Sequence, residues 1–166
     1  MLSEIDNYLQ RLDDLRDQIK TLVEMVKPGD LDWQPFPGDG EQTSNSLAAL
    51  VAHCCGRERF WISEVIGGHP STSDRKTELS IKNRSHAELF QLLNQNSIDT
   101  RAVLSKLEPA DLDGSRLVEG KLVPVRWGIL HVIDHTALHL GHMQMTYQML
   151  TGGIPFPAPL WKQRVP

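Results

Sequence analysis

The order of hydrophobic and polar residues along the chain predicts four long amphipathic helices. In four stretches apolar residues recur at every third or fourth position, which is the spacing of one helix face, and charged residues lie between them. The predicted helices run from Leu2 to about Lys27, from Ser44 or Asn45 to about Ile66, from Ser85 to about Leu107, and from Pro124 or Val125 to Leu150. The pattern therefore predicts an all-α protein.

Helix-breaking and helix-capping residues mark the ends of these stretches. Pro28 ends the first helix and Gly67 ends the second. Ser85 and Glu88 have the spacing of a capping box, in which Ser85 caps the third helix and Glu88 reaches back to it. Four long helices joined by two longer connections favour a four-helix bundle, and we expect residues 1–166 to form a single domain.

The connections between the predicted helices are polar or rich in proline and glycine. The loop after the first helix carries Trp33 and Phe36, which we expect to pack into a crevice. Residues 68–84 are polar and are predicted to be irregular, whereas residues 117–125 are predicted to form a short extended piece or a hairpin. The tail, residues 154–166, contains four prolines and is expected to lie extended along the bundle.

Composition and charge exclude several classes of function. The chain has 166 residues, of which 40% are hydrophobic and 23% charged, as in ordinary globular domains. Its net charge is −4 and no basic cluster stands out, so no nucleic acid is expected as a partner. The chain contains no run of about 18 apolar residues, so no membrane-spanning helix is expected. The N-terminus lacks a signal-peptide pattern. The adjacent Cys54 and Cys55 cannot staple distant segments, which favours reduced thiols and a cytoplasmic location.

Four histidines lie within twelve residues of the fourth predicted helix, namely His131, His135, His139 and His142. A rotation of about 100° per residue places all four along one stripe of that helix. Burying several imidazoles is costly unless each has a partner, and zinc, nickel, iron and copper are partners that neutral imidazole binds well. Two pairs have the i, i+4 spacing that can hold one ion, and a merely hydrogen-bonded or pH-sensitive cluster is the alternative.

A further ligand is expected from another helix, and His53 in the second predicted helix is the candidate. It follows a run of small apolar residues and should point inward. Three histidines with water in the fourth position would make a catalytic rather than a closed structural site. Cys54 and Cys55 point away from His53 around the helix and are expected to be core residues, whereas Arg57 and Trp61 could line the pocket.

Four other polar residues are given plainer roles. We expect Glu58 to form an ion pair or to support packing, and we expect His69 and His86 to be solvated. Asp134 is interpreted as a surface carboxylate, or one that supports the site, rather than as a base. None of these four is expected to bind a metal ion directly.

Two motifs carry a resemblance to a known family. The first is His53 followed by Glu58 and Trp61 in HCCGRERFW, and the second is HTALHLGH from His135 to His142. Together with four helices of the right length, they resemble the DinB/YfiT-like superfamily of metalloenzymes. The resemblance covers nearly the whole chain.

The resemblance implies a fold and a ligand set. It implies an up-down-down-up four-helix bundle in which His53, His135 and His139 bind one divalent ion, zinc or nickel. His142 occupies a position at which relatives often have glutamine, and His131 lies outside the ligand set. Some relatives are S-transferases or a maleylpyruvate isomerase that use mycothiol, bacillithiol or glutathione.

Two classes of function follow from these expectations. In the first, the protein is a metal-dependent enzyme that acts on a small molecule, either as an S-transferase on a low-molecular-weight thiol or as a hydrolase. His142 and Arg57 are the catalytic candidates, and His142 or His131 could move the proton. In the second, it is a non-catalytic metal-binding module of a stress response, and a plain helical bundle with packed histidines is the third reading. Apolar helix edges and the aromatic tail, with Phe156 and Trp161, also make a homodimer an expectation.

Overall fold

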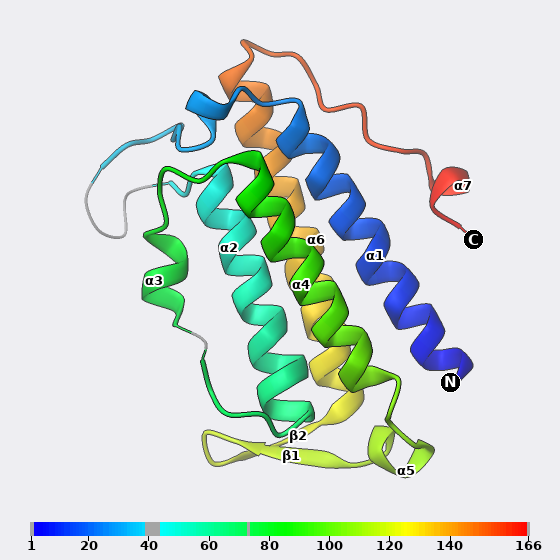
Figure 1. The fold of residues 1–166 in the computed structure, drawn as a ribbon. Helices are drawn as coiled ribbons and strands as arrows, with labels where there is room; N and C mark the ends of the chain where they lie inside the picture. The colour runs from blue at the N-terminus through cyan, green and yellow to red at the C-terminus, as the bar shows by residue number, and fades with distance from the viewer. Residues whose placement is uncertain (1, 39–43, 73, 166) are drawn as a thin grey trace.

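In the computed structural model, four long helical segments lie side by side and form the body of the protein (Figure 1). The structure describes residues 2–38, 44–72 and 74–165. The four segments are α1 (Ser3–Glu24), α2 (Leu47–Glu58) continued by η3 (Arg59–Ile66), α4 (His86–Leu104) and α6 (Val125–Leu150). Helices α1 and α6 run in one direction and α2 and α4 in the other, so the predicted up-down-down-up four-helix bundle is confirmed.

Helices α2 and α4 begin at side chains that satisfy exposed backbone N–H groups of the first turn. The Oγ atom of Ser46 accepts a hydrogen bond from the N–H of Ala49 at 3.2 Å and caps α2. The cap was predicted one or two residues earlier, and that position was wrong. The capping box of α4 is confirmed, because Glu88 N–H donates to Ser85 Oγ at 3.3 Å and Ser85 N–H donates to Glu88 Oε2 at 2.9 Å.

Two helices end earlier than the sequence pattern predicted. Helix α1 ends at Glu24 rather than near Lys27, because Lys27 adopts an extended backbone before Pro28. A proline disfavours the helical conformation of the residue that precedes it. Helix α4 ends at Leu104 instead of about Leu107. Short helices η1 (Pro28–Asp30) and α5 (Pro109–Leu112) follow these two ends.

The second helix reaches Ile66, as predicted, but its last eight residues are wound as a π-helix. Gly67 ends this segment, with its N–H donating to the carbonyl oxygen of Ile62 at 2.9 Å. π-helical turns widen a helix and occur often at functional sites. Here the widened segment contains Trp61, which lines the cavity described below.

The apolar stripe of α1 supplies much of the core. Its buried apolar side chains face the other three helices and are Ile5, Leu9, Leu12, Leu15, Ile19, Leu22 and Val23. The small apolar run that opens α2 is buried against them. Fully burying one such aliphatic side chain contributes about 1.5–3 kcal/mol, so these contacts hold the helices that carry the site in register.

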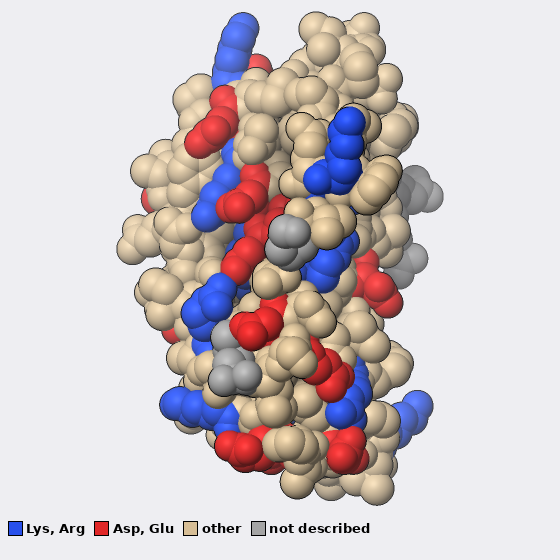
Figure 2. Space-filling model, turned by 90° about the vertical axis from the view of Figure 1, so that its right-hand side faces the viewer, with Lys and Arg blue, Asp and Glu red and all other residues tan. Residues whose placement is uncertain are grey.

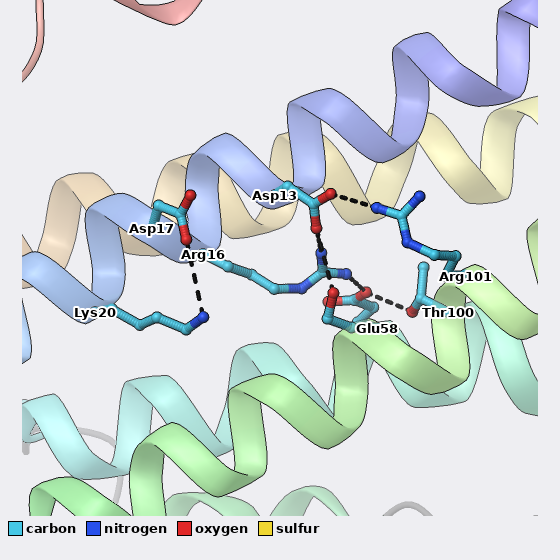
Figure 3. A network of polar contacts seen from close by, with 8 residues as sticks. Asp13, Arg16, Asp17, Lys20, Glu58, Thr100 and Arg101 are labelled. Atoms are coloured by element: carbon cyan, nitrogen blue, oxygen red, sulfur yellow. Dashed lines mark hydrogen bonds and ion pairs between the residues drawn. The ribbon is translucent and has the colours of Figure 1, made fainter.

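A buried polar network crosses the same interior and joins α1, α2 and α4 (Figure 3). The guanidinium of Arg16 donates to Glu58, and Thr100 Oγ1 donates to the same carboxylate at 2.5 Å. Asp13 accepts from Arg16 at 2.7 Å and from Arg101 at 2.6 Å. The predicted role of Glu58 as an ion-pair residue is therefore confirmed.

The connection between α2 and α4 contains a short helix that the sequence analysis did not predict. This helix is α3 (Arg75–Leu79), and it packs against α2 (Figure 1). Asp74 caps it by accepting a hydrogen bond from Lys76 N–H at 3.0 Å. The prediction of an irregular segment over residues 68–84 was wrong at this point, because a capped single turn is too short to show helical periodicity.

A two-stranded hairpin closes one end of the bundle. Strands β1 (Ser115–Val118) and β2 (Lys121–Pro124) pair antiparallel. Glu119 and Gly120 both have positive φ, at 49° and 81°, as the two-residue hairpin turn requires. The predicted hairpin around these two residues is confirmed.

The C-terminal tail lies along the bundle, as predicted, and ends in the short helix α7 (Trp161–Arg164). Phe156 is buried with its ring 6.4 Å from that of Tyr147. Arg164 pairs with Asp14 of α1 at 2.9 Å. The last proline, residue 166, and residues 39–43 of the loop after α1 lie outside the described residues.

Two expectations about burial were wrong. Phe36 does not occupy a crevice, since 63% of it is exposed, although Trp33 is partly buried. The apolar residues around the four histidines predict that α6 is largely buried, yet Leu130, Leu138 and Met145 are about half exposed. The bundle covers only one side of α6, and its other side keeps apolar residues at the surface.

Charges are mixed on the protein surface rather than gathered by sign. Figure 2 shows acidic and basic side chains interspersed over the face that it presents. This agrees with the absence of a basic cluster in the sequence. In the described part of the chain, none of the helices combines the length and the apolar character needed to cross a membrane.

Candidate metal centre

Three histidine side chains from two helices converge near the middle of the bundle. The ring of His53, from α2, lies 5.0 Å from the ring of His135 and 5.0 Å from that of His139, both from α6, measured between centroids. The rings of His135 and His139 are 4.4 Å apart. One nitrogen from each of the three rings can be chosen so that all three lie within 4.8 Å of one another.

The helices explain why these three rings meet. His135 and His139 are four residues apart on α6, so both project from one face of it. Helix α2 packs against α6, and His53 faces the interface with only 5% of its surface exposed. The structure therefore brings together the three histidines predicted as ligands.

The contacts of the ring nitrogens suit metal coordination. The Nδ1 atom of His53 lies 3.2 Å from Glu78 Oε2, and the Nδ1 atom of His139 lies 3.3 Å from His142 Nδ1. Each of these contacts involves Nδ1, and Nε2 is the other nitrogen through which the same ring could bind an ion. The Nδ1 atom of His135 is buried with no hydrogen-bond partner among the described residues. A buried polar atom without a partner is costly, and a cation could satisfy it.

The electrostatics of the cluster favour neutral imidazoles. Burial, followed by the proximity of His139 and His53, lowers the pKa of His135 to about 3. A histidine must be neutral to bind a metal ion, so His135 is in its ligand form across the physiological pH range. Imidazole nitrogens are good ligands for transition metals, so the three residues present fit a divalent transition-metal ion.

A cavity of about 660 Å³ opens next to the three histidines. Helices α2 and α6, the π-helical segment and the hairpin all contribute to its wall. Residues that line it include Arg57, Trp61, Lys121, Trp127 and His131. The predicted placement of Arg57 and Trp61 at the pocket is confirmed, whereas the contribution of the hairpin and of Trp127 was not predicted.

The other two histidines of α6 lie on either side of the cluster. His131 stacks on Trp127, and its ring centroid is 5.9 Å from that of His135. His142 is exposed and contacts His139. Neither belongs to the group of three whose ligand atoms converge. Their predicted roles in moving protons stay predictions.

Arg57, the other catalytic candidate, is held at the rim of the cavity. Its guanidinium lies over the ring of Phe60, 5.1 Å from the centroid, and 3.6 Å from Glu78 Oε1. Glu78 is a residue of the site that the sequence analysis missed. Asp74 at the start of α3 was the available signal, because an aspartate that caps a short helix would have placed Glu78 within that helix.

Cys54 and Cys55 are buried among core residues, as predicted. Burial raises the pKa of both thiols well above the ordinary value. The thiolate form needed for nucleophilic attack or metal binding is therefore suppressed in both residues. Neither cysteine belongs to the cluster of three histidines.

The expectations for three further residues can be compared with the structure directly. His69 and Asp134 are exposed, as expected. His86 was expected to be solvated, but it is partly buried and its Nε2 atom lies 2.9 Å from the carbonyl oxygen of Val26. That prediction was wrong because the N-terminus of α4 packs beside the end of α1. His86 fixes the junction between these two helices.

Comparison with known proteins identifies the family of this chain. The sequence model of the family described as mycothiol-S-transferase matches residues 8–152. The chain belongs to this family. The mycothiol-S-transferase family is part of the DinB/YfiT-like superfamily, so the resemblance seen in the sequence is confirmed.

A solved structure supports the fold independently. The crystal structure of a conserved protein from Enterococcus faecalis superposes with a TM-score of 0.73 at 13% sequence identity. The match covers 92% of this chain and 99% of that protein. At this identity the likeness concerns the fold alone. No curated relative matches the sequence.

Proposed function

We propose that this protein is a metal-dependent S-transferase that joins a low-molecular-weight thiol of the mycothiol class to an electrophilic carbon. In this proposal His53, His135 and His139 bind one divalent ion, zinc or nickel, within a single domain over residues 1–166. The observation that carries the proposal is the convergence of three imidazoles beside an open cavity. Membership of the mycothiol-S-transferase family supports the choice of thiol.

The imidazoles of His53, His135 and His139 would hold the ion, which when bound would lower the pKa of a thiol and make its sulfur nucleophilic near neutral pH. In the transfer, the sulfur forms a bond to the electrophilic carbon, and the leaving group departs with the electrons of the bond that breaks. The thiol proton must pass to a base. His142 and His131 are the nearest further imidazoles, and we propose one of them as the acceptor.

The cavity wall accounts for substrate binding in this proposal. Trp61 and Trp127 present indole rings that can pack against the carbon skeleton of a substrate. Arg57 and Lys121 add positive charge at the same cavity, where an anionic leaving group would be stabilised. Cys54 and Cys55 are buried and are left out of the reaction, so the attacking sulfur belongs to the substrate.

Two alternatives use the same centre. A hydrolase would use the ion to activate water against an ester or amide, and a non-catalytic stress-response module would only hold the ion. A structural centre is expected to have a fourth protein ligand and no adjacent cavity. The group of three histidines among the described residues, with a cavity and Arg57 beside it, favours chemistry over a purely structural role. A cytoplasmic location and a homodimer stay predictions.

Metal content tests the first half of the proposal. The protein should be purified without a histidine tag, and bound metal measured by elemental analysis in the wild type, His53→Ala and His139→Ala. We expect about one equivalent in the wild type and near-complete loss in both variants. His69→Ala is the matched control, since His69 is exposed and distant in sequence from the cluster. Unchanged occupancy in both site variants would remove the proposed centre.

Thioether formation tests the second half of the proposal, which is the S-transferase activity. The metal-loaded protein should be incubated with mycothiol, bacillithiol or glutathione and an alkylating electrophile, and the thioether product quantified. We expect the protein to accelerate thioether formation over the rate without protein, and most strongly with mycothiol. Removal of the metal by a chelator, or the His139→Ala substitution, should abolish this acceleration. If metal binds stoichiometrically while no thiol reacts faster than without protein, the S-transferase assignment fails. Ester hydrolysis by the same preparation would then favour the hydrolase.

A further inference from the structure

The carboxylate of Glu78 connects the candidate metal centre to the short helix α3. Its Oε2 atom lies 3.2 Å from His53 Nδ1, and its Oε1 atom lies 3.6 Å from Arg57 Nη2. Both partners in the first contact are well buried, with 6% of the His53 side chain and 11% of the Glu78 side chain exposed. A carboxylate so withdrawn from water needs polar partners, and here these partners are a candidate ligand and the neighbouring arginine.

The approach of Glu78 to His53 depends on a glycine in α2. A Cβ atom added at Gly56 would overlap the carboxylate of Glu78. Glycine within a helix costs about 1 kcal/mol relative to alanine, so its presence in the middle of α2 has a local cost. The missing side chain creates the space in which the carboxylate sits against His53.

We propose that Glu78 is a positioning residue of the metal centre, which accepts a hydrogen bond from His53 Nδ1–H and thereby directs His53 Nε2 toward the ion. The inference rests on the proposed metal site. A neutral imidazole carries its proton on one nitrogen, and the hydrogen bond made by that nitrogen decides which tautomer is present. Carboxylates that accept from the outer nitrogen of a ligand histidine fix the orientation of the ring and raise its basicity.

The charge of Glu78 has a second effect at the same place. Arg57 lies on the turn of α2 that follows His53, and its positive charge by itself disfavours a cation nearby. Glu78 lies between these two side chains and contacts both. The carboxylate therefore offsets the charge of Arg57 while it orients His53, so its removal should weaken cation binding by both routes.

The test compares zinc affinity with the tautomer of His53. Zinc affinity is measured by chelator competition for the wild type, Glu78→Ala, Glu78→Gln and Gly56→Ala. We expect Glu78→Ala to weaken binding by about 10- to 100-fold, and Glu78→Gln by less, because an amide oxygen still accepts a hydrogen bond but carries no charge. Gly56→Ala should match Glu78→Ala although the carboxylate is retained.

The tautomer is observed in the metal-free protein by long-range ¹H–¹⁵N correlation NMR of the histidine rings. We expect His53 in the wild type to carry its proton on Nδ1 and to lose this preference in Glu78→Ala. A role of Glu78 limited to anchoring α3 would not shift the tautomer. Circular dichroism on each variant confirms that the bundle remains folded.

Two matched controls isolate the contact. Glu24→Gln removes a carboxylate from the exposed end of α1, and Gly141→Ala adds a methyl group where nothing lies within 4 Å. Both should leave zinc affinity within about twofold of the wild type. Failure of the wild type to bind either zinc or nickel would overturn the proposed function itself. A zinc-binding wild type with unchanged affinity and unchanged His53 tautomer in Glu78→Ala would overturn this inference alone.

Discussion

The indole ring of Trp127 lies parallel to the imidazole ring of His131, with centroids 4.8 Å apart and an interplanar angle of 6°. Trp61 meets both rings edge-on at 5.4 Å. The three rings form one aromatic wall of the cavity beside the cluster of three histidines. His131 is thus engaged in stacking, although its sequence spacing allowed it to pair with His135 as a metal ligand.

Replacing His131 by alanine should separate substrate binding from metal binding. We expect His131→Ala to retain its metal, because the three converging imidazoles do not include His131. We expect KM to rise by about 2- to 10-fold, since stacked aromatic pairs contribute about 0.5–1.5 kcal/mol to the wall that contacts substrate. Elemental analysis and steady-state kinetics measure the two effects. Loss of the metal from this variant would instead make His131 a ligand.

Removing Arg16 should strongly destabilise the fold. Arg16→Ala leaves the carboxylate of Glu58 buried without its cation, and breaking one side of a buried ion pair costs about 3–5 kcal/mol. Urea denaturation measures the free energy of unfolding. The control is Arg11→Ala, whose pair with Asp14 is more exposed and should contribute only about 0–1 kcal/mol. Equal losses in the two variants would show that the buried network does not stabilise the bundle.

The stability of the metal-free protein should fall as the solution is acidified. The pKa of His135 is about 3 in the folded protein, below its ordinary value of 6.5. Between these two pH values the unfolded chain binds a proton that the folded chain does not, so the free energy of unfolding decreases as pH falls. Urea denaturation at several pH values should show this slope reduced in His135→Gln. His69→Gln, at an exposed position, serves as the control and should keep the wild-type slope.

Cys54 and Cys55 should be inert in the native protein. Both thiols are buried, and burial raises their pKa, so little thiolate is present at pH 8 and reagents cannot reach it. Iodoacetamide followed by mass spectrometry should modify neither residue in buffer and both in denaturant. Cys55→Ala should retain thioether formation at the wild-type rate. If either cysteine of the folded protein were alkylated rapidly and activity were lost with it, a cysteine would take part in the reaction.

Features set by a few neighbouring residues could be predicted from the sequence. Ser85 and Glu88 form their capping box within a single helical turn, and Glu119 with Gly120 forms a two-residue hairpin turn. The shared face of His135 and His139 follows from the rotation per residue of a helix. Each of these features depends only on backbone geometry within a few consecutive residues.

Features that depend on how separate segments pack required the tertiary structure. Periodicity could not show that His53 meets His135 and His139, that α6 keeps an exposed apolar side, or that His131 stacks on Trp127 rather than joining the cluster. The position of Glu78 beside His53 depends on a short helix with too few residues to show a period. The sequence by itself determined the four long helices and the chemistry they carry. Only packing decided which side chains meet, because each helix can turn any face inward until all four have buried their apolar surface together.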